Sequence, residues 1–253
     1  MRLLFVVLLP LSCTLDTRGA MNIVAQTSLR CPPGFLDTLR SVLSSPDALL
    51  VGEAAAEAAS HDWGSHAHCA PLAVALPASP EEVQAVVRIC VSFRVAFTPR
   101  GAGTGLEGGA VAYSGGIVLD TSLLKQIAVH PDLLQVVVGA GVTKMELGKA
   151  LAAHSLLFGP DPASNPSLGG MASTSGSGMT TLRYGTTREN VVSLLVVTPQ
   201  GELLRTRTRA YFSPAPLSTF SDLHLLSFFQ PFARALPGWS SHSCTSGRRA
   251  RWA

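Results

Sequence analysis

The residues best suited to chemistry in this sequence are glycines, which crowd into Pro99-Arg100-Gly101-Ala102-Gly103-Thr104-Gly105-Leu106-Glu107-Gly108-Gly109. Glycines at alternate positions present successive backbone N–H groups to an anion with no Cβ in the way, which is typical of a nest for a pyrophosphate. A Rossmann-type loop is disfavoured, because the glycine pairs further along would break the helix that must follow it. A flexible linker is disfavoured because the stretch directly follows an apolar segment. The pattern therefore favours an anionic ligand.

A second stretch of small residues begins with Gly159-Pro160-Asp161-Pro162, continues over 167–178 and ends with Arg183-Tyr184-Gly185. Such residues allow a cofactor ring to lie directly against the backbone, and Ser and Thr hydroxyls donate to ring or phosphate oxygens. A Ser/Gly linker between domains is the alternative, but the stretch includes Met171 and returns to an apolar segment. Two such loops in one domain predict a single long cofactor held at two places.

Apolar periodicity and capping residues predict the elements around the first stretch. The segment Leu72–Leu76 is bounded by prolines and is typical of a buried strand. Ser79 and Glu82 form a capping box that starts a helix expected to end near Phe93. A strand is then expected over 95–98, giving a strand-helix-strand unit that typically makes a parallel pair. The apolar face of the helix is predicted to be Val83, Val86, Val87, Cys90 and Val91.

The same logic recurs before the second stretch. A strand is expected over 133–138, and Thr143 with Glu146 caps a helix that buries Leu147 and Leu151 and ends near His154. Later, Pro199-Gln200-Gly201 separates two apolar runs, 191–198 and 202–206, which predicts a hairpin. These elements indicate an α/β or α+β class with a mixed sheet.

Length and composition place the chain among globular proteins. Its 253 residues are 47% hydrophobic and 14% charged, against about 25% charged in ordinary domains. The formal net charge of +3 is spread thinly rather than gathered in a basic stripe. We therefore expect no nucleic-acid partner.

Cysteine and histidine predict no metal site. The five cysteines include no CxxC pair and their number is odd, so we expect mostly reduced thiols. The one cluster of metal-ligand residue types is His61, His66, His68 and Cys69. Structural zinc sites usually draw their ligands from two separated pairs, and this run has no second half. No metal-binding residue is therefore predicted.

The N-terminus is apolar from Leu3 to Leu9, the length of a signal-peptide core and well short of the ~20 residues of a membrane helix. No transmembrane helix is predicted. A secretory signal peptide at residues 1–20 would place Arg18 where a small residue is preferred. A second start at Met21 would leave a segment with one base and no acid up to Leu36, a weak match to a transit peptide. Both interpretations stay open.

Taken together, Pro99–Gly109 and Pro160–Gly185 resemble the two halves of the FAD-binding PCMH-type domain of the vanillyl-alcohol-oxidase superfamily. Within it, the motifs are similar to the branch of cytochrome-linked, mitochondrial D-lactate dehydrogenases and the FAD subunit of glycolate oxidase. The resemblance covers about Pro71 to Arg207. It implies an α+β fold with mixed sheets and flanking helices.

The resemblance also implies FAD as the cofactor. In the family, the Gly101–Gly105 loop wraps the FAD pyrophosphate, and the Gly169–Gly178 segment runs along it toward the isoalloxazine. Members that bind flavin covalently through this loop carry His where this chain has Thr104, so non-covalent FAD is expected. The residues expected to bind it are Arg100, Gly101, Ala102, Gly103, Thr104, Gly105, Pro160, Gly169, Gly170, Ala172, Ser173, Gly176, Gly178, Tyr184 and Gly185.

The activity implied by the family is oxidation of a D-2-hydroxy acid such as D-lactate to the 2-oxo acid. Electrons would pass to cytochrome c or another acceptor, and a mitochondrial location is expected. No catalytic residue is predicted. His130 and His154 lie at the ends of expected elements, where a histidine satisfies carbonyls without a catalytic role.

The sequence departs from the family after the second motif, because the Gly-Ser-Glu-Gly-Thr-Leu-Gly segment and the cap domain have no counterpart. From Tyr211 the composition changes, with a single acid, Asp222, in the rest of the chain. We expect a targeting-like segment (1–36), a helical lead-in (37–70), a partial FAD domain (71–210) incomplete at its C-terminal end, and an unrelated, disordered tail (211–253). The alternative function is therefore a catalytically inactive, truncated FAD-binding fragment from a splice variant or gene-model product.

Overall fold

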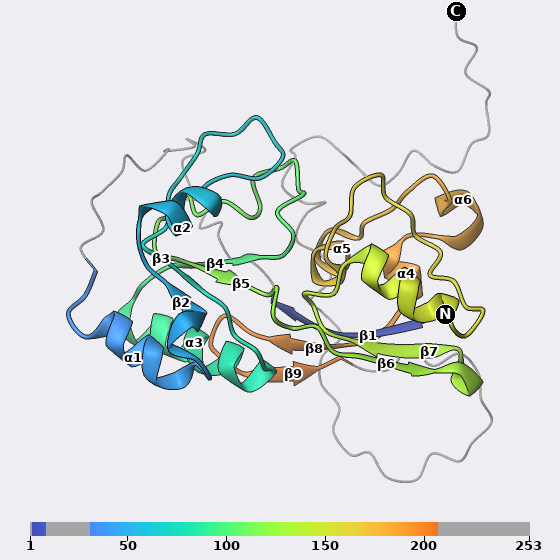
Figure 1. Cartoon of the computed structure of the whole chain (residues 1–253), viewed down its shortest axis with the longest axis horizontal. Coiled ribbons are helices and arrows are strands. Elements are labelled where there is room, and N and C mark those ends of the chain that lie inside the picture. Colours follow the sequence, from blue (N-terminus) through green and yellow to red (C-terminus); the bar gives the residue numbers. More distant parts are fainter. Residues whose placement is uncertain (1, 9–30, 207–253) are drawn as a thin grey trace, which may run out of the picture. The chain divides into compact units, whose positions relative to one another are not determined.

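The computed structural model describes residues 2–8 and 31–206, all within one compact unit. Two mixed sheets carry the fold, with helices packed against them (Figure 1). The elements in chain order are β1 (Arg2–Leu8), α1 (Phe35–Val42), η1 (Pro46–Ala48), β2 (Leu49–Leu50), α2 (Glu53–Ala58), β3 (Ala73–Ala75), α3 (Pro80–Phe93), β4 (Phe97–Arg100), β5 (Ile117–Asp120), β6 (Ile127–His130), η2 (Pro131–Leu133), β7 (Gln135–Val138), α4 (Lys144–Ala152), α5 (Leu168–Thr174), α6 (Thr181–Tyr184), α7 (Thr187–Asn190), β8 (Val191–Val197) and β9 (Leu203–Arg205).

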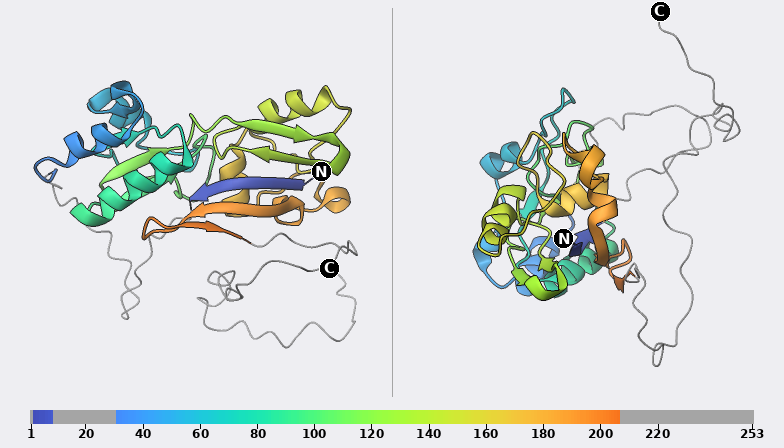
Figure 2. Two further views of the ribbon diagram at one scale, coloured as in Figure 1. Left: turned by 90° about the horizontal axis from the view of Figure 1, so that it is seen from below. Right: turned by 90° about the vertical axis from the view of Figure 1, so that its right-hand side faces the viewer.

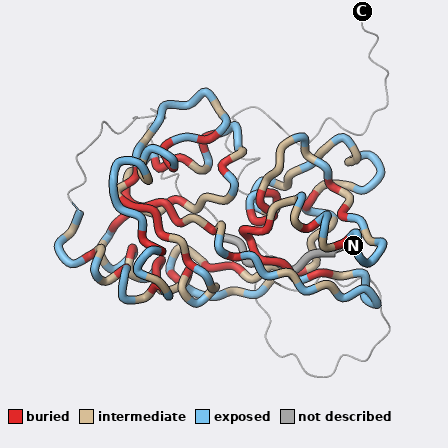
Figure 3. The backbone as a smooth tube through the Cα atoms, viewed as in Figure 1, coloured by how far each residue is buried: buried red, intermediate tan, exposed pale blue. Residues whose placement is uncertain are grey.

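The smaller sheet has the order β2-β3-β5-β4 and supports the first glycine stretch. β5 is parallel to both β3 and β4, whereas β2 is antiparallel to β3. β3 is buried throughout, and β5 is buried except at Asp120, so these two strands form the red centre of the sheet in Figure 3. Helix α3 packs its buried residues into the same core as Phe35 and Leu39 of α1. The glycine stretch leaves the end of β4, an edge strand that pairs with the buried strand β5.

The larger sheet has the order β6-β7-β1-β8-β9. β1 is parallel to both β7 and β8, and antiparallel pairs close the two edges of the sheet. Figure 2 shows the blue strand β1 beside the orange strand β8. A second core lies on this sheet, where Leu147 and Leu151 of α4 pack with Leu168 and Met171 of α5. The second small-residue stretch packs into this core through Leu168 and Met171.

The structure confirms most of the predicted elements. Ser79 Oγ accepts from the Glu82 amide and starts α3, although the Glu82 carboxylate accepts from the Ala78 amide rather than from the cap residue itself. The capping box of Thr143 and Glu146 is complete and starts α4. The strand expected over 133–138 is β7, which begins two residues later at Gln135, because Leu133 ends the turn η2. The predicted hairpin is the antiparallel pair β8 and β9.

Three expectations about local structure were wrong. Val91 is 49% exposed although Cys90 in the same turn of α3 is fully buried, because Val91 lies at the edge of the helix face that packs into the core. The strand expected over 95–98 begins two residues later, at Phe97. β3 and β4 are not paired directly, since β5 lies between them and is parallel to both.

Residues 2–8, expected to belong to a targeting segment, form strand β1 inside the larger sheet. An apolar run satisfies a buried parallel strand as well as a signal-peptide core, so the sequence did not distinguish the two. The rest of the targeting segment, with Cys13, and the predicted tail over 211–253, with Cys244, lie outside the described residues. The targeting and tail assignments stay predictions.

Within the described ranges, Cys31, Cys69 and Cys90 are free thiols, as expected. Burial raises the pKa of the Cys90 thiol to about 12. No helix among the described residues has the length and apolarity needed to span a membrane.

Candidate functional site

The first glycine stretch leaves β4 as a series of bends that present backbone amides. The amides of Gly101 to Gly105 donate to no other atom of the part of the chain that the structure describes. Gly103 has φ of +66°, a conformation that favours glycine, and it is buried. Successive unpartnered amides around a left-handed residue are the geometry of an anion-binding nest.

A buried carboxylate fixes the far side of this loop. Asp62 is 5% exposed, and its two oxygens accept from the amides of Gly64 and Gly108, each at 2.8 Å. The adjacent Trp63 amide donates to the Gly105 carbonyl at 3.0 Å. The loop is therefore tied to the segment before β3 at two places, which reduces the entropy that it loses on binding a ligand.

Arg100 anchors the near side of the loop. Its guanidinium donates to the carbonyl of His61 at 2.7 Å and lies 3.5 Å from the carbonyl of Ala58. A Cβ at Gly103 would overlap this guanidinium. The structure thus gives Arg100 a role in positioning the loop, and direct contact with a cofactor stays a prediction.

The second stretch meets the first at the start of α5. A Cβ at Gly101 would overlap Ser167 Oγ, which caps α5 by accepting from the Gly170 amide at 3.3 Å. Gly169 is also closely packed, since a Cβ added there would lie 2.7 Å from the Cβ of Ala140. Gly101 of the first stretch and Ser167 of the second are therefore side by side, the arrangement that a single cofactor held at two places requires.

The two stretches do not offer the same groups. The Gly169 amide donates to the Ala140 carbonyl at 2.9 Å, and the Leu168 amide donates to that of Val142 at 2.8 Å. The hydroxyl of Ser173 donates back to the Gly169 carbonyl at 2.9 Å. These groups of the second stretch are satisfied internally, so the stretch contributes closely packed small-residue backbone while the first contributes free donors.

Three further predicted residues of the second stretch, Gly176, Gly178 and Gly185, lie in the turns around α6. Gly178 packs against the backbone of Asp161 so closely that a Cβ would overlap it. The Gly176 carbonyl accepts from both the amide and the hydroxyl of Thr187, at 2.9 and 2.6 Å. Gly185 ends α6 with φ of +77°. These glycines fix the path of the backbone.

Pro160 and Tyr184 line one pocket. Its volume is about 340 Å³, and its walls come from α4, the turn at 156–161 and α6. Lys144 stands at the pocket and donates to Asp161 Oδ1 and to the Pro162 carbonyl, both at 2.7 Å. The pocket brings together residues of the turn and of α6 that the sequence analysis placed in one site.

Of the other predicted residues, Ala102 and Gly170 are exposed, whereas Thr104 and Ala172 are half-buried. Ala172 packs against the second core. Their contact with a cofactor stays a prediction.

Electrostatics around the site come from a few groups. The pKa of Glu146 is lowered to about 2, mainly by its hydrogen bond with Lys125 and also by the amide of Thr143. Burial, and secondarily the negative charge of Asp62, raises the pKa of Tyr113, which packs against Gly108. Tyr113 therefore stays a neutral hydroxyl beside the loop.

Sequence reasoning missed two parts of the site. Asp62 holds the glycine loop, yet in the sequence it is a single acid among histidines. The turn Gly139-Ala140-Gly141 was also overlooked, although a Gly-x-Gly directly after a strand was a usable signal. Cβ atoms at Gly139 and Gly141 would overlap the carbonyls of Leu124 and Thr121, so this turn packs tightly against the segment after β5, while its Ala140 contacts Gly169 of the second stretch.

Comparisons with known proteins agree with this geometry. A family model described as an FAD binding domain matches residues 71–207. The chain is 40% identical over 195 residues to a probable mitochondrial D-lactate dehydrogenase of Danio rerio, covering 77% of this chain and 38% of the relative. It is also 40% identical over 146 residues to the mitochondrial D-lactate dehydrogenase [cytochrome] of Arabidopsis thaliana, covering 57% of this chain and 26% of the relative. The chain thus spans between about a quarter and two fifths of these relatives.

The fold is similar to that of solved structures. An alkyldihydroxyacetonephosphate synthase matches with a TM-score of 0.66 at 24% identity, covering 73% of this chain and 37% of that one. At this identity the match shows the fold alone. The mixed α+β architecture, the loop with unpartnered amides and a family model that covers more than half of the chain agree. The chain belongs to the PCMH-type FAD-binding domain family, whose cofactor is FAD.

Proposed function

We propose that this chain carries the FAD-binding part of a dehydrogenase that oxidises a D-2-hydroxy acid, such as D-lactate, to the 2-oxo acid. Its support is membership of the FAD-binding family together with two relatives named D-lactate dehydrogenase. Electrons pass to cytochrome c or another acceptor, in line with the word cytochrome in the name of the Arabidopsis thaliana relative. The protein acts in mitochondria, in line with the names of both relatives.

The observation that carries the proposal is the row of amides at Gly101–Gly105, which have no hydrogen-bond partner in the described part of the chain and lie directly against the N-terminus of α5. Bound FAD supplies the acceptor for the hydride of the substrate. The residues of this chain bind and orient it: the amides hold the pyrophosphate, and the backbone around Gly169 runs alongside. Asp62 and Arg100 keep the loop in the binding shape before the cofactor arrives.

We further propose that FAD is held without a covalent bond. The position that carries His in covalent members of the family is Thr104, whose side chain has no imidazole nitrogen to form such a bond. Denaturing the purified protein should therefore release all of its flavin into the supernatant. Flavin that stays with the precipitated protein would contradict this assignment.

A second candidate is an FAD-binding fragment without turnover. It is favoured by the placement of the two histidines that the sequence analysis considered as bases. Among the described residues, His130 is exposed at the end of β6 and His154 is exposed after α4, and neither lines the pocket beside Pro160. We assign no catalytic base to this chain.

The test is an absorbance spectrum of the full, desalted chain, followed by anaerobic addition of D-lactate, with L-lactate as the control. Flavin bands that D-lactate bleaches and L-lactate leaves unchanged support the dehydrogenase. Flavin bands that neither acid bleaches support the inactive fragment. A folded chain that binds no added FAD overturns both. Cytochrome c, added after the substrate, then tests the proposed acceptor.

A further inference from the structure

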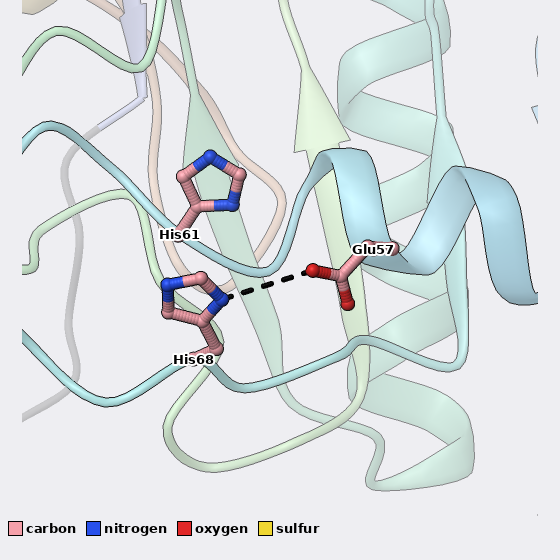
Figure 4. A group of neighbouring side chains, drawn as sticks. All are labelled: Glu57, His61 and His68. Atoms are coloured by element: carbon pink, nitrogen blue, oxygen red, sulfur yellow. Dashed lines mark ion pairs between the residues drawn. The ribbon is translucent and has the colours of Figure 1, made fainter.

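One group of side chains outside the glycine loops has the composition of a metal site. Glu57, His61 and His68 each offer one ligand atom, and these three atoms lie within 4.8 Å of one another. Figure 4 shows the two imidazoles next to each other, with the Glu57 carboxylate beside His68. The rings are stacked, with their centroids 4.8 Å apart and an angle of 16° between the planes. The proposed function uses none of these side chains.

The backbone brings the three residues together for a definite reason. Glu57 lies in the last turn of α2, and the Ser60 hydroxyl donates to its carbonyl at 2.7 Å, which turns the chain after the helix. The Cys69 amide then donates to the Ser60 carbonyl at 2.9 Å, so the returning segment lies beside the helix end. The Arg100 guanidinium donates a hydrogen bond to the carbonyl of His61. The backbone that carries all three side chains is therefore fixed by hydrogen bonds.

The fold supplies a metal ligand from outside the histidine-rich run, which the sequence alone did not indicate. The histidine-rich run has no second group of ligands within itself, but the fold adds a carboxylate from α2. The other residues of the run are used elsewhere. His66 Nε2 lies 2.9 Å from the Leu106 carbonyl, and neither His66 nor Cys69 belongs to the group of three.

We propose that Glu57, His61 and His68 form an open binding site for a divalent first-row transition-metal ion such as Zn²⁺ or Co²⁺. Two imidazoles and one carboxylate are a ligand set that suits these ions. Bonds of about 2.0 to 2.2 Å from metal to ligand require the ligand atoms to lie about 3.3 Å apart. Because the three atoms lie within 4.8 Å of one another, the longest of these distances shortens by up to about 1.5 Å when the ion binds. Water completes the coordination, because His68 and Glu57 have 60% and 68% of their side chains exposed.

An ordinary surface ion pair explains only part of the geometry. His68 Nδ1 lies 3.7 Å from Glu57 Oε1, and an exposed pair of this kind contributes little stability. It does not account for the second imidazole, which stacks on the first. A metal ion accounts for the convergence of all three ligand atoms, since it holds two neutral imidazoles and a carboxylate at once. Because a bound ion lies in the plane of each imidazole that binds it, the two stacked rings turn out of their parallel arrangement on binding.

The site lies next to the residue that fixes the flavin loop. His61 directly precedes Asp62, whose carboxylate accepts from the amide of Gly108. A metal ion therefore joins the end of α2 to the segment that holds the loop and restrains both. Binding of the ion does not depend on FAD, so the site can be tested whether or not the flavin proposal holds.

The test measures Co²⁺ binding by the full chain in equilibrium dialysis, with metal and bound flavin quantified in the same samples. The site variants are His61→Ala, His68→Ala and Glu57→Gln. His154→Ala removes an exposed histidine elsewhere, and His66→Ala removes one from the same segment but outside the site. Zn²⁺ is added afterwards as a competitor. Thermal unfolding with and without Co²⁺ shows that each variant is folded and whether the ion stabilises it.

The expected result is one Co²⁺ per chain that Zn²⁺ displaces, with a rise of the Tm in the presence of the ion. Each site variant should weaken Co²⁺ binding about tenfold or more and abolish the rise of the Tm, because each removes a ligand. The two control variants should bind Co²⁺ as the parent chain does. Equal affinity in the parent chain and in folded His61→Ala and His68→Ala proteins would overturn the proposal. Loss of binding in the control variants as well would do the same, since the ion would then depend on histidines in general.

Discussion

Replacement of Gly103 by alanine tests the central loop most directly. The residue has φ of +66°, and a non-glycine residue in this region costs about 1–2 kcal/mol. The new Cβ would also overlap the Arg100 guanidinium, which can move away only by giving up its hydrogen bond to the His61 carbonyl. Because this bond is partly exposed to solvent, its loss adds about 1 kcal/mol. Gly103→Ala should therefore destabilise the chain by about 2–3 kcal/mol.

For a protein of this size, that cost lowers the Tm by about 4–12 °C. If at least about 1.4 kcal/mol of it falls on the loop shape that binds FAD, the Kd for FAD rises about tenfold. Both quantities can be measured on one preparation, the Tm by circular dichroism and the Kd by quenching of flavin fluorescence. The matched control is Gly109→Ala, because Gly109 has no positive φ and its Cβ would meet no atom within 4 Å. The loop assignment is refuted if Gly103→Ala binds FAD as tightly as the Gly109→Ala control.

Three further substitutions test other parts of the structure. Glu146 has its pKa lowered to about 2, chiefly by Lys125, so it stabilises the fold above the unfolded value near 4.5, and this contribution disappears as the pH falls toward 2. Because the Glu146 side chain is 44% exposed, the effect is about 1 kcal/mol or less, and Glu146→Gln should flatten the dependence of the Tm on pH in this interval. Asp62→Asn leaves the amide of either Gly64 or Gly108 without an acceptor, which should cost about 1–3 kcal/mol in urea unfolding and weaken FAD retention. Leu147→Ala should cost about 2–5 kcal/mol because the side chain is fully buried, whereas Leu133→Ala, at a position 64% exposed, should change the unfolding free energy by less than about 0.5 kcal/mol.

Local signals in the sequence were sufficient for the helices that bury one face. In α4 the cap and the buried residues lie within nine positions of each other, so Thr143, Glu146, Leu147 and Leu151 could all be assigned from the periodicity. The loss of Val91 from the predicted face of α3 shows the limit of this method. The 3.6-residue period gives the direction of a side chain but not how wide a stripe of the helix surface its neighbours cover.

Strand order and the assembly of the site depend on contacts that no local window contains. A strand-helix-strand unit indicated that β3 and β4 run parallel, yet β5, which comes later in the chain, inserts between them. The carboxylate of Asp62 reaches the amide of Gly108 across 46 positions of sequence. A single acid in a loop carries no pattern that predicts such a partner, so the anchor of the glycine loop could be found only in the structure.

The two small-residue stretches show why composition alone does not distinguish a binding loop from a packing loop. Both are rich in glycine, and both were predicted to contact the cofactor. In the first, the amides of Gly101–Gly105 have no partner among the described residues and the backbone turns through a left-handed glycine. In the second, glycine is required at Gly169 and Gly178 because Ala140 and the backbone of Asp161 leave no room for a Cβ. Alanine at Gly178 should therefore act first on the free energy of unfolding, and alanine at Gly103 on both that quantity and the Kd for FAD.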